Sequence, residues 1–291
     1  MKLDSVIVGH ATVDVNVHPQ GIVENILGGA PTYAGFAMTK LNKEVGIVSK
    51  IGKDFPDYFP PLFSKFGLNT EGILTTSGMT TKFENRYSED DERNQIVQEV
   101  ADSISPADIP EQYMNARSFY LSPVADEIPP ETILKLSKTE GVTMLDPQGI
   151  FREIGDSGAI EIKKPSSLSE YFKEVDIVKM SSDEFRTFDK PGSEVLRDIV
   201  DMGPEIAILT LGEDGCRILF DEDITHVDGF DVDVKDLTGA GDVFGAAFLS
   251  EYLESKNPLK AARFANAAAA LKIEYKGPTG FPSRDEVREL L

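Results

Sequence analysis

Short apolar segments alternate with amphipathic segments along most of the chain. The runs SVIVGH (5–10) and EVGIVSKIG (44–52) are typical of buried strands, and PTYAGFAMTKLN (31–42) between them has helical spacing with proline at its start. The same alternation continues through 118–124, 130–141, 142–149, 176–181, 193–203 and 205–215. Strands separated by helices of about ten to fifteen residues indicate βαβ units. We therefore predict an α/β fold with three layers, in which a mainly parallel sheet lies between two layers of helices.

Two stretches, 13–27 and 71–100, depart from this rhythm. Both alternate polar and apolar residues, and the second contains the turn-like sequence SEDDER at 88–93. Alternation of this kind favours hairpins over crossover helices. We infer a small β-rich flap inserted into a single domain that covers residues 1–291, with ordinary surface hairpins as the alternative.

Composition and charge narrow the class of protein. The chain has 50 acidic and 29 basic residues, and a formal charge of −21 repels nucleic acid and anionic lipid. No apolar run is long enough for a membrane span, and the single cysteine, Cys216, can form neither an internal disulfide nor a thiolate metal site. We expect a soluble, cytoplasmic protein that binds neither nucleic acid nor membranes.

The strongest chemical signal is DLTGAGDVFGAAF (236–248). Gly239, Ala240 and Gly241 offer backbone N–H groups with little side-chain bulk at the start of a helix predicted over 240–255. Such a helix start suits an anion, and amides fixed there can stabilise a transferring phosphoryl group. Asp242 stands where it can accept a proton from an attacking hydroxyl. The alternative is that Asp242 is only a helix cap and the glycines only a turn.

Two further glycine-containing segments follow predicted strands. The segment TLGEDG follows the strand at 205–209, and the first strand is followed by an acid and then by a glycine pair. Ligands bind at such strand ends in α/β proteins, and a carboxylate near glycine suits a polyol. The residues concerned are Thr210, Gly212 and Gly215, and Asp14, Gly28 and Gly29. Neither a Walker A loop nor a G-x-G-x-x-G motif after the first strand is present, which argues against a classical NAD-type dehydrogenase.

Together these segments resemble the ribokinase-like, or PfkB, family of carbohydrate kinases. The resemblance spans essentially the whole chain and rests on Asp14, on GGAPTYAGFAMTKLNKEVGIVSKIGKDF (28–55), on TLGEDG (210–215) and above all on DLTGAGDVFGAAF. It implies an ATP- and Mg²⁺-dependent kinase for a small polyhydroxy substrate, with the β-rich insertion as a lid over the sugar. A non-catalytic sugar- or nucleotide-binding module with the same fold is the alternative.

The resemblance also assigns roles to individual residues. It implies that Asp242 is the catalytic base and that the backbone of 239–241 is the anion hole. Asp14, Gly28 and Gly29 become substrate contacts, and the ATP site receives Thr210, Gly212, Gly215 and Asn266.

Metal sites follow from the same resemblance. Glu184 matches the acid of the family's N-x-x-E motif, which orients Mg²⁺ through water, although Ser181 stands where asparagine is usual. Asp236 and Thr238, with the turn around Gly277, could bind a monovalent cation such as K⁺. Family lids often pair across a homodimer, and an exposed apolar face on the lid would support that here.

The sequence predicts the substrate less specifically than it predicts the reaction. The segment LDPQGIFREIGDSGAI (145–160) looks like the D-x-Q-G-x-x-R segment of myo-inositol kinases, which favours a cyclic polyol over ribose, fructose, a nucleoside or a keto-deoxy sugar acid. A sugar acid would need cations in the pocket, for which the candidates are Lys82, Arg86, Arg93 and Arg152.

Overall fold

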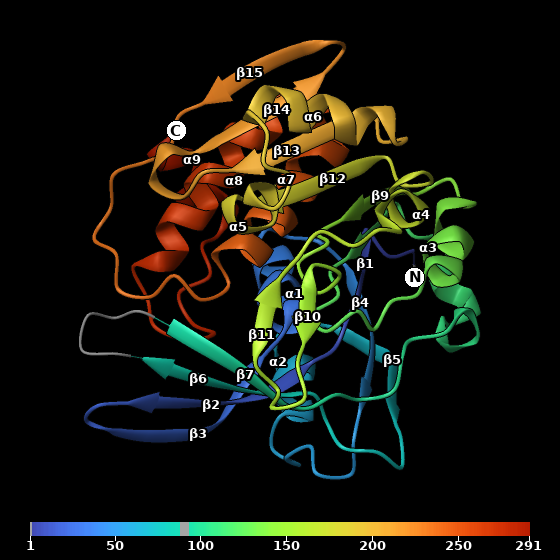
Figure 1. Cartoon of the computed structure of the whole chain (residues 1–291), viewed down its shortest axis with the longest axis vertical. Helices are drawn as coiled ribbons and strands as arrows, with labels where there is room; N and C mark the ends of the chain where they lie inside the picture. The colour runs from blue at the N-terminus through green and yellow to red at the C-terminus, as the bar shows by residue number, and fades with distance from the viewer. Residues whose placement is uncertain (1, 88–92) are drawn as a thin grey trace.

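A nine-stranded sheet forms the centre of the molecule in this computed structural model, which describes residues 2–87 and 93–291 (Figure 1). Its strand order is β15-β14-β13-β12-β9-β8-β1-β4-β5, parallel from β5 to β13 and antiparallel from β13 to β15. The bounds are β1 Ser5–Val8, β4 Val45–Ile51, β5 Asn69–Thr75, β8 Ser118–Leu121, β9 Val142–Leu145, β12 Ile177–Ser181, β13 Ile206–Thr210, β14 Cys216–Phe220 and β15 Asp223–Val227. The mainly parallel sheet predicted from the sequence is confirmed.

Helices pack on both faces of this sheet and bury two separate hydrophobic clusters. One layer contains α1 Ala30–Lys40, α7 Ala240–Ser255, α8 Pro258–Ile273 and α9 Arg284–Leu290, and the short α2 Pro60–Lys65 joins the same cluster. The other layer contains α3 Pro130–Ser137, α4 Leu168–Phe172 and α6 Gly192–Asp201. The strands between the layers are apolar on both faces, as β1 and β8 show with every residue buried. The predicted three-layer arrangement is therefore confirmed.

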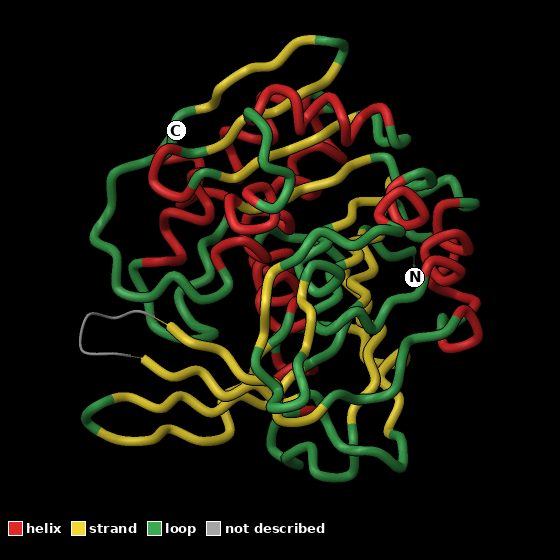
Figure 2. The backbone as a smooth tube through the Cα atoms, in the orientation of Figure 1, coloured by secondary structure: helices red, strands yellow, loops and turns green. Residues whose placement is uncertain are grey.

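A separate four-stranded sheet, the lid sheet, projects from one end of the large sheet (Figures 1 and 2). Its order is β3-β2-β6-β7, in which the two outer pairs are antiparallel and the central pair is parallel. The bounds are β2 Thr12–His18, β3 Gly21–Gly28, β6 Lys82–Tyr87 and β7 Arg93–Glu99. A two-stranded ribbon of β10 Arg152–Ile154 and β11 Ile160–Ile162 meets β7 through a bridge between Ile96 and Ala159.

The structure corrects one boundary of the predicted lid. Residues 71–75 lie in β5, at the edge of the large sheet, so of the described residues in the stretch 71–100 only 82–87 and 93–99 enter the lid sheet. Most of the turn SEDDER lies outside the described residues. The alternation in 71–75 is real, but it reflects an edge strand, whose outer side chains meet solvent just as those of a hairpin do.

Helix α7 begins at Ala240 and ends at Ser255, which matches the helix predicted over 240–255. Ten of its residues are buried against α1 and α8, where Ala246, Ala247 and the alanines of α8 allow close packing. Its first turn is thereby held rigidly near the carboxyl ends of β9 and β12. No helix within the described residues is long and apolar enough to cross a membrane.

Candidate active site

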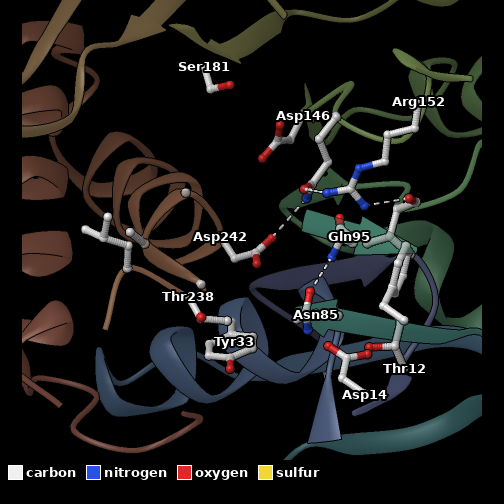
Figure 3. Close-up of a pocket in the computed structure, with 18 of the residues that line it drawn as sticks. Thr12, Asp14, Tyr33, Asn85, Gln95, Asp146, Arg152, Ser181, Thr238 and Asp242 are labelled. Carbon is white, nitrogen blue, oxygen red and sulfur yellow. Dashed lines mark hydrogen bonds between the residues drawn. The ribbon is translucent and has the colours of Figure 1, made fainter. Parts of the chain in front are cut away.

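A cavity lies between the carboxyl ends of the large sheet's strands and the lid sheet (Figure 3). The lid contributes Thr12, Asp14, Phe83, Asn85 and Gln95 to its wall. The large sheet contributes Asp146, which follows β9, and Lys179 and Ser181 of β12, and the start of α7 closes the cavity with residues 237–242. Open α/β sheets bind ligands at this edge because the loops after parallel strands converge there.

Asp242 lies in the first turn of α7, and its carboxyl group reaches the cavity. Ser122 Oγ and Gln148 Nε2 each lie 3.5 Å from Asp242 Oδ1. Burial, followed by the nearby charge of Asp146, raises the pKa of Asp242 to about 7, although Lys179 and Arg152 act in the opposite direction. A carboxylate with a pKa near the working pH is well suited to general base catalysis.

The backbone at the start of α7 requires a glycine at position 239. Gly239 adopts a left-handed conformation with φ of 78°, and a β-carbon there would lie 2.1 Å from the ring of Tyr33. The N–H of Ala240 donates to Leu237 O at 3.2 Å, whereas no partner is recorded among the described residues for the N–H groups of Gly239 and Gly241. Two of the three predicted anion-hole amides are therefore available to a ligand, and the third would have to exchange its bond.

A buried ion pair lies beside this cradle. Lys179 Nζ donates to Asp146 Oδ2 at 2.5 Å, and both side chains are 4% exposed. Tyr120 donates to the same carboxylate oxygen at 3.1 Å, and Lys179 Nζ also lies 3.3 Å from Gly241 O. Although burial favours the neutral amine, the Asp146 carboxylate keeps the pKa of Lys179 above its ordinary value. A permanent positive charge therefore stands next to the first turn of α7.

The lid side of the cavity is rich in amides. Gln95 donates to Asn85 at 2.9 Å, and Asn85 donates to Asn16 at 3.0 Å, so a chain of amides crosses β7, β6 and β2. Opposite, Arg152 donates to Val124 O at 2.7 Å and to Gln148 at 3.3 Å. Amides both donate and accept, which suits the hydroxyl groups of a neutral ligand.

Of the three cations proposed for a sugar acid whose side chains the structure describes, Arg152 lines the cavity and Lys82 and Arg86 do not. The guanidinium of Arg152 lies over the ring of Phe83, 5.4 Å from the centroid. Arg86 is exposed and pairs with Glu84, and Lys82 does not line the cavity. The side chain of Arg93 lies outside what the structure describes.

Asp14, Gly28 and Gly29 lie together where the lid joins the large sheet. Asp14 and Gly29 line the cavity, and Gly28 lies behind them. A β-carbon at Gly28 would come within 2.5 Å of Thr12 Oγ1 and 2.7 Å of Asp14 Oδ2. This glycine therefore leaves room for two polar side chains that face the ligand.

Glu184 and Ser181 form a capping box at the start of α5 Ser182–Arg186. Glu184 Oε2 accepts from the backbone N–H of Ser181 at 2.6 Å and from the Ser181 hydroxyl. Within the described chain its other carboxylate oxygen has no recorded partner, and both residues line the cavity. Mg²⁺ in kinases is held by one or two carboxylates together with phosphates and waters. Glu184 fits that role, and no larger cluster of metal-binding side chains occurs among the residues described.

Asp236 fixes the turn that leads into the anion hole. It accepts from the N–H groups of Thr238 at 2.9 Å and Gly277 at 2.7 Å. Burial by itself would raise the pKa of Asp236, but the hydrogen bonds with Thr238 and Gly277 hold that pKa below its ordinary value. A bound monovalent cation at this turn remains a prediction.

The four residues assigned to the ATP site lie outside the cavity wall. Thr210 ends β13 and contacts Met180 O at 3.3 Å, and Gly212 and Gly215 flank the short turn before β14. Asn266 donates to Val227 O and Asp228 O, both at 3.0 Å. Both N–H groups of the Asn266 amide therefore hold the end of β15. Asn266 would contact a nucleotide through its side-chain carbonyl oxygen, or indirectly through the backbone of 227–228 that it holds.

Sequence reasoning named no individual role for several residues of the cavity wall, namely Thr12, Asn85, Gln95, Asp146, Gln148 and Lys179. Asp146 and Gln148 lie in the D-x-Q-G-x-x-R segment, and Lys179 had a usable signal of its own, because it is a charged residue within the otherwise largely apolar strand β12. The lid amides had none, since polar residues alternate along any hairpin.

Comparisons with known proteins identify the family of this chain. The family model described as pfkB family carbohydrate kinase matches residues 2–284. A cytidine kinase from Thermococcus kodakarensis is 30% identical over 86% of this chain and 88% of its own length. An inositol 3-kinase from Arabidopsis thaliana is 27% identical over 94% of this chain and 75% of its own length.

A solved structure described as a pyrophosphate-dependent kinase in the ribokinase family, complexed with a pyrophosphate analogue and myo-inositol, has the same fold. It is 23% identical, covers 99% of this chain and 100% of its own, and superposes with a TM-score of 0.83. The match of the family model over nearly the whole chain decides the assignment. This protein belongs to the pfkB family of carbohydrate kinases.

Proposed function

We propose that this kinase transfers the γ-phosphoryl group of ATP to a hydroxyl of a small neutral polyol or sugar, with Asp242 as the general base. The observation that carries the proposal is the meeting, in one cavity, of Asp242 and the amides of Gly239 and Gly241 with the amide-lined lid face. Asp242 and the amides of Gly239 and Gly241 serve the phosphoryl transfer, and the lid binds the acceptor.

The transfer is an in-line displacement at the γ-phosphorus. The acceptor oxygen forms the new P–O bond while the bond to the bridging β,γ oxygen breaks and ADP leaves with that electron pair. Asp242 takes the acceptor's proton, which its raised pKa favours. The amides of the anion hole stabilise the charge that spreads over the phosphoryl oxygens. Mg²⁺, held near Glu184, would neutralise the donor's phosphates.

A cyclic polyol such as myo-inositol is the leading acceptor. Asn85, Gln95 and Gln148 present neutral groups that can donate to and accept from hydroxyls. A sugar acid fits less well, because Arg152 is engaged by Val124 and Gln148, and Lys82 and Arg86 do not line the cavity. The similarity to plant inositol 3-kinases supports the same acceptor class.

A nucleoside is the second candidate. Phe83 and Tyr33 line the cavity and could stack against a base, and the similar cytidine kinase points the same way. The two acceptors can be told apart by removing one ring, since Phe83→Leu would raise KM for a nucleoside far more than for inositol.

The decisive experiment is an ADP-release assay with ATP and Mg²⁺ over inositols, sugars, sugar acids and nucleosides. We expect turnover with a neutral polyol and a loss of about a hundredfold or more in Asp242→Asn. Near-wild-type turnover in that variant would remove the base assignment. Tight binding of polyols with no ADP formed on any acceptor would favour a non-catalytic binding module instead.

Two further features belong to the proposal. A monovalent cation such as K⁺ would order the turn of Asp236 and Thr238, so activity should rise with K⁺. A homodimer through the lid is supported by Ile22 and Val23 on the outer strand β3, which are 63% and 52% exposed. Sedimentation at micromolar concentration that shows only monomer would contradict the dimer.

A further inference from the structure

The ion pair of Lys179 and Asp146 lies beside the first turn of α7, and the family resemblance gave neither residue an individual role. Lys179 is 3% exposed overall, which is unusual for a lysine, and its ammonium group nevertheless reaches the wall of the cavity. An ammonium group has three N–H donors. Within the described chain two have partners, Asp146 Oδ2 and Gly241 O, so one donor is left on the cavity side.

The position of Lys179 relative to the anion hole is set by backbone contact. Its Nζ lies 3.3 Å from the carbonyl oxygen of Gly241. A β-carbon at Gly241 would lie only 3.0 Å from that Nζ, and no other atom within 4 Å crowds the position. The missing side chain at Gly241 thus gives the ammonium group its place directly beside the first turn of α7.

The charges that line the cavity indicate what this ammonium group can bind. Four carboxylates line the wall, those of Asp14, Asp146, Glu184 and Asp242, against two cations, Arg152 and Lys179. Arg152 stands on the acceptor side, over Phe83 of the lid. Among the described residues, Lys179 is therefore the cation that a phosphoryl donor entering this negative cavity would meet at the predicted anion hole.

We propose that Lys179 binds the transferring phosphoryl group together with the amides of Gly239 and Gly241, and that Asp146 is the positioning residue that holds it there. The inference deepens the proposed function, on which it rests. Tyr120 completes the support, because its hydroxyl donates to the same Asp146 oxygen that Lys179 contacts. In the transfer the ammonium group stabilises the phosphoryl oxygens while Asp242 takes the acceptor's proton, and Lys179 stays protonated throughout.

A purely structural ion pair is the alternative, and a double-mutant cycle separates the two. Lys179→Met or Asp146→Asn alone leaves one buried charge without its partner and should lower the melting temperature strongly. The double variant Lys179→Met/Asp146→Asn removes both charges and should recover most of that loss. We expect its kcat to stay at least a hundredfold below wild type, whereas a structural pair would recover turnover together with stability.

Binding of inorganic pyrophosphate, measured by calorimetry, tests Lys179 without any acceptor. We expect the double variant to bind at least tenfold more weakly than wild type, and Asp242→Asn, which keeps Lys179, to retain its affinity. If wild type forms no ADP on any acceptor, the proposed function fails, yet a loss of pyrophosphate affinity in the double variant still supports the role of Lys179. A wild type that binds pyrophosphate no better than the double variant, or a double variant with wild-type turnover, overturns the inference.

Discussion

Replacement of Asp242 by asparagine should make this protein more stable while it abolishes turnover. Burial raises the pKa of this carboxyl group from an ordinary 3.8 to about 7 in the folded state. Between those values the folded state binds a proton that the unfolded state does not, so stability falls as pH rises through this window. Above pH 7 the whole cost of the buried charge is present, and asparagine removes it.

The magnitude follows from the shift. A difference of roughly three pKa units corresponds to about 4 kcal/mol at pH 8, at about 1.4 kcal/mol per unit. At pH 5 the folded carboxyl group is protonated, and about 1.6 kcal/mol remains. Asp242 is only partly buried, so these values are upper bounds. We expect a gain for Asp242→Asn that is about 2 kcal/mol larger at pH 8 than at pH 5.

Urea unfolding of wild type and Asp242→Asn at both pH values measures this difference. Asp233→Asn is a matched control, because Asp233 is exposed and its replacement should change stability little at either pH. An equal effect of Asp242→Asn at pH 5 and pH 8, or destabilisation at pH 8, would show that burial does not perturb this carboxyl group and would refute the reasoning.

Three further predictions concern the same cavity. Because Asp242 must be ionised to accept a proton, kcat/KM should fall tenfold per pH unit below about pH 7; a profile that stays flat to pH 5 would exclude it as the base. Asn85→Leu breaks the amide chain of the lid, so KM for the acceptor should rise about tenfold while KM for ATP stays unchanged. Equal changes in the two KM values would argue against a role of Asn85 in binding the acceptor. Gly239→Ala should disrupt the anion hole, since φ is 78° and the new β-carbon meets Tyr33, whereas Gly277→Ala, with φ of 56° and open space, should only lower the melting temperature slightly.

Much of the fold was predictable because hydrophobic pattern reports local burial. The runs at 5–10 and 44–52 are typical of strands buried on both faces, and they form β1 and β4, neighbours in the parallel sheet. The start of α7 was also predicted correctly, since glycine and aspartate before an apolar helical run mark a helix start. Those features depend on neighbours in sequence, which the chain itself displays.

Partners distant in sequence were decided only by the tertiary structure. The alternating residues 71–75 joined the large sheet because their partner is β4, which nothing in their own pattern indicates. Likewise Asn266 had its amide donors taken by the end of β15, 38 residues away or more. A pattern of polar and apolar positions indicates that one face of a segment is exposed, but it does not indicate which segment of the chain packs against the other face.

The ion pair shows the same division most clearly. The sequence alone showed a lysine within one apolar strand and an aspartate directly after another, and it predicted an anion cradle at the start of α7. Only the parallel packing of β9 beside β12 placed Asp146 and Lys179, 33 residues apart, in contact under Gly241. The physical reason is that charge and burial act through space, so the pKa of Asp242 and the place of Lys179 depend on distances that only the folded chain defines.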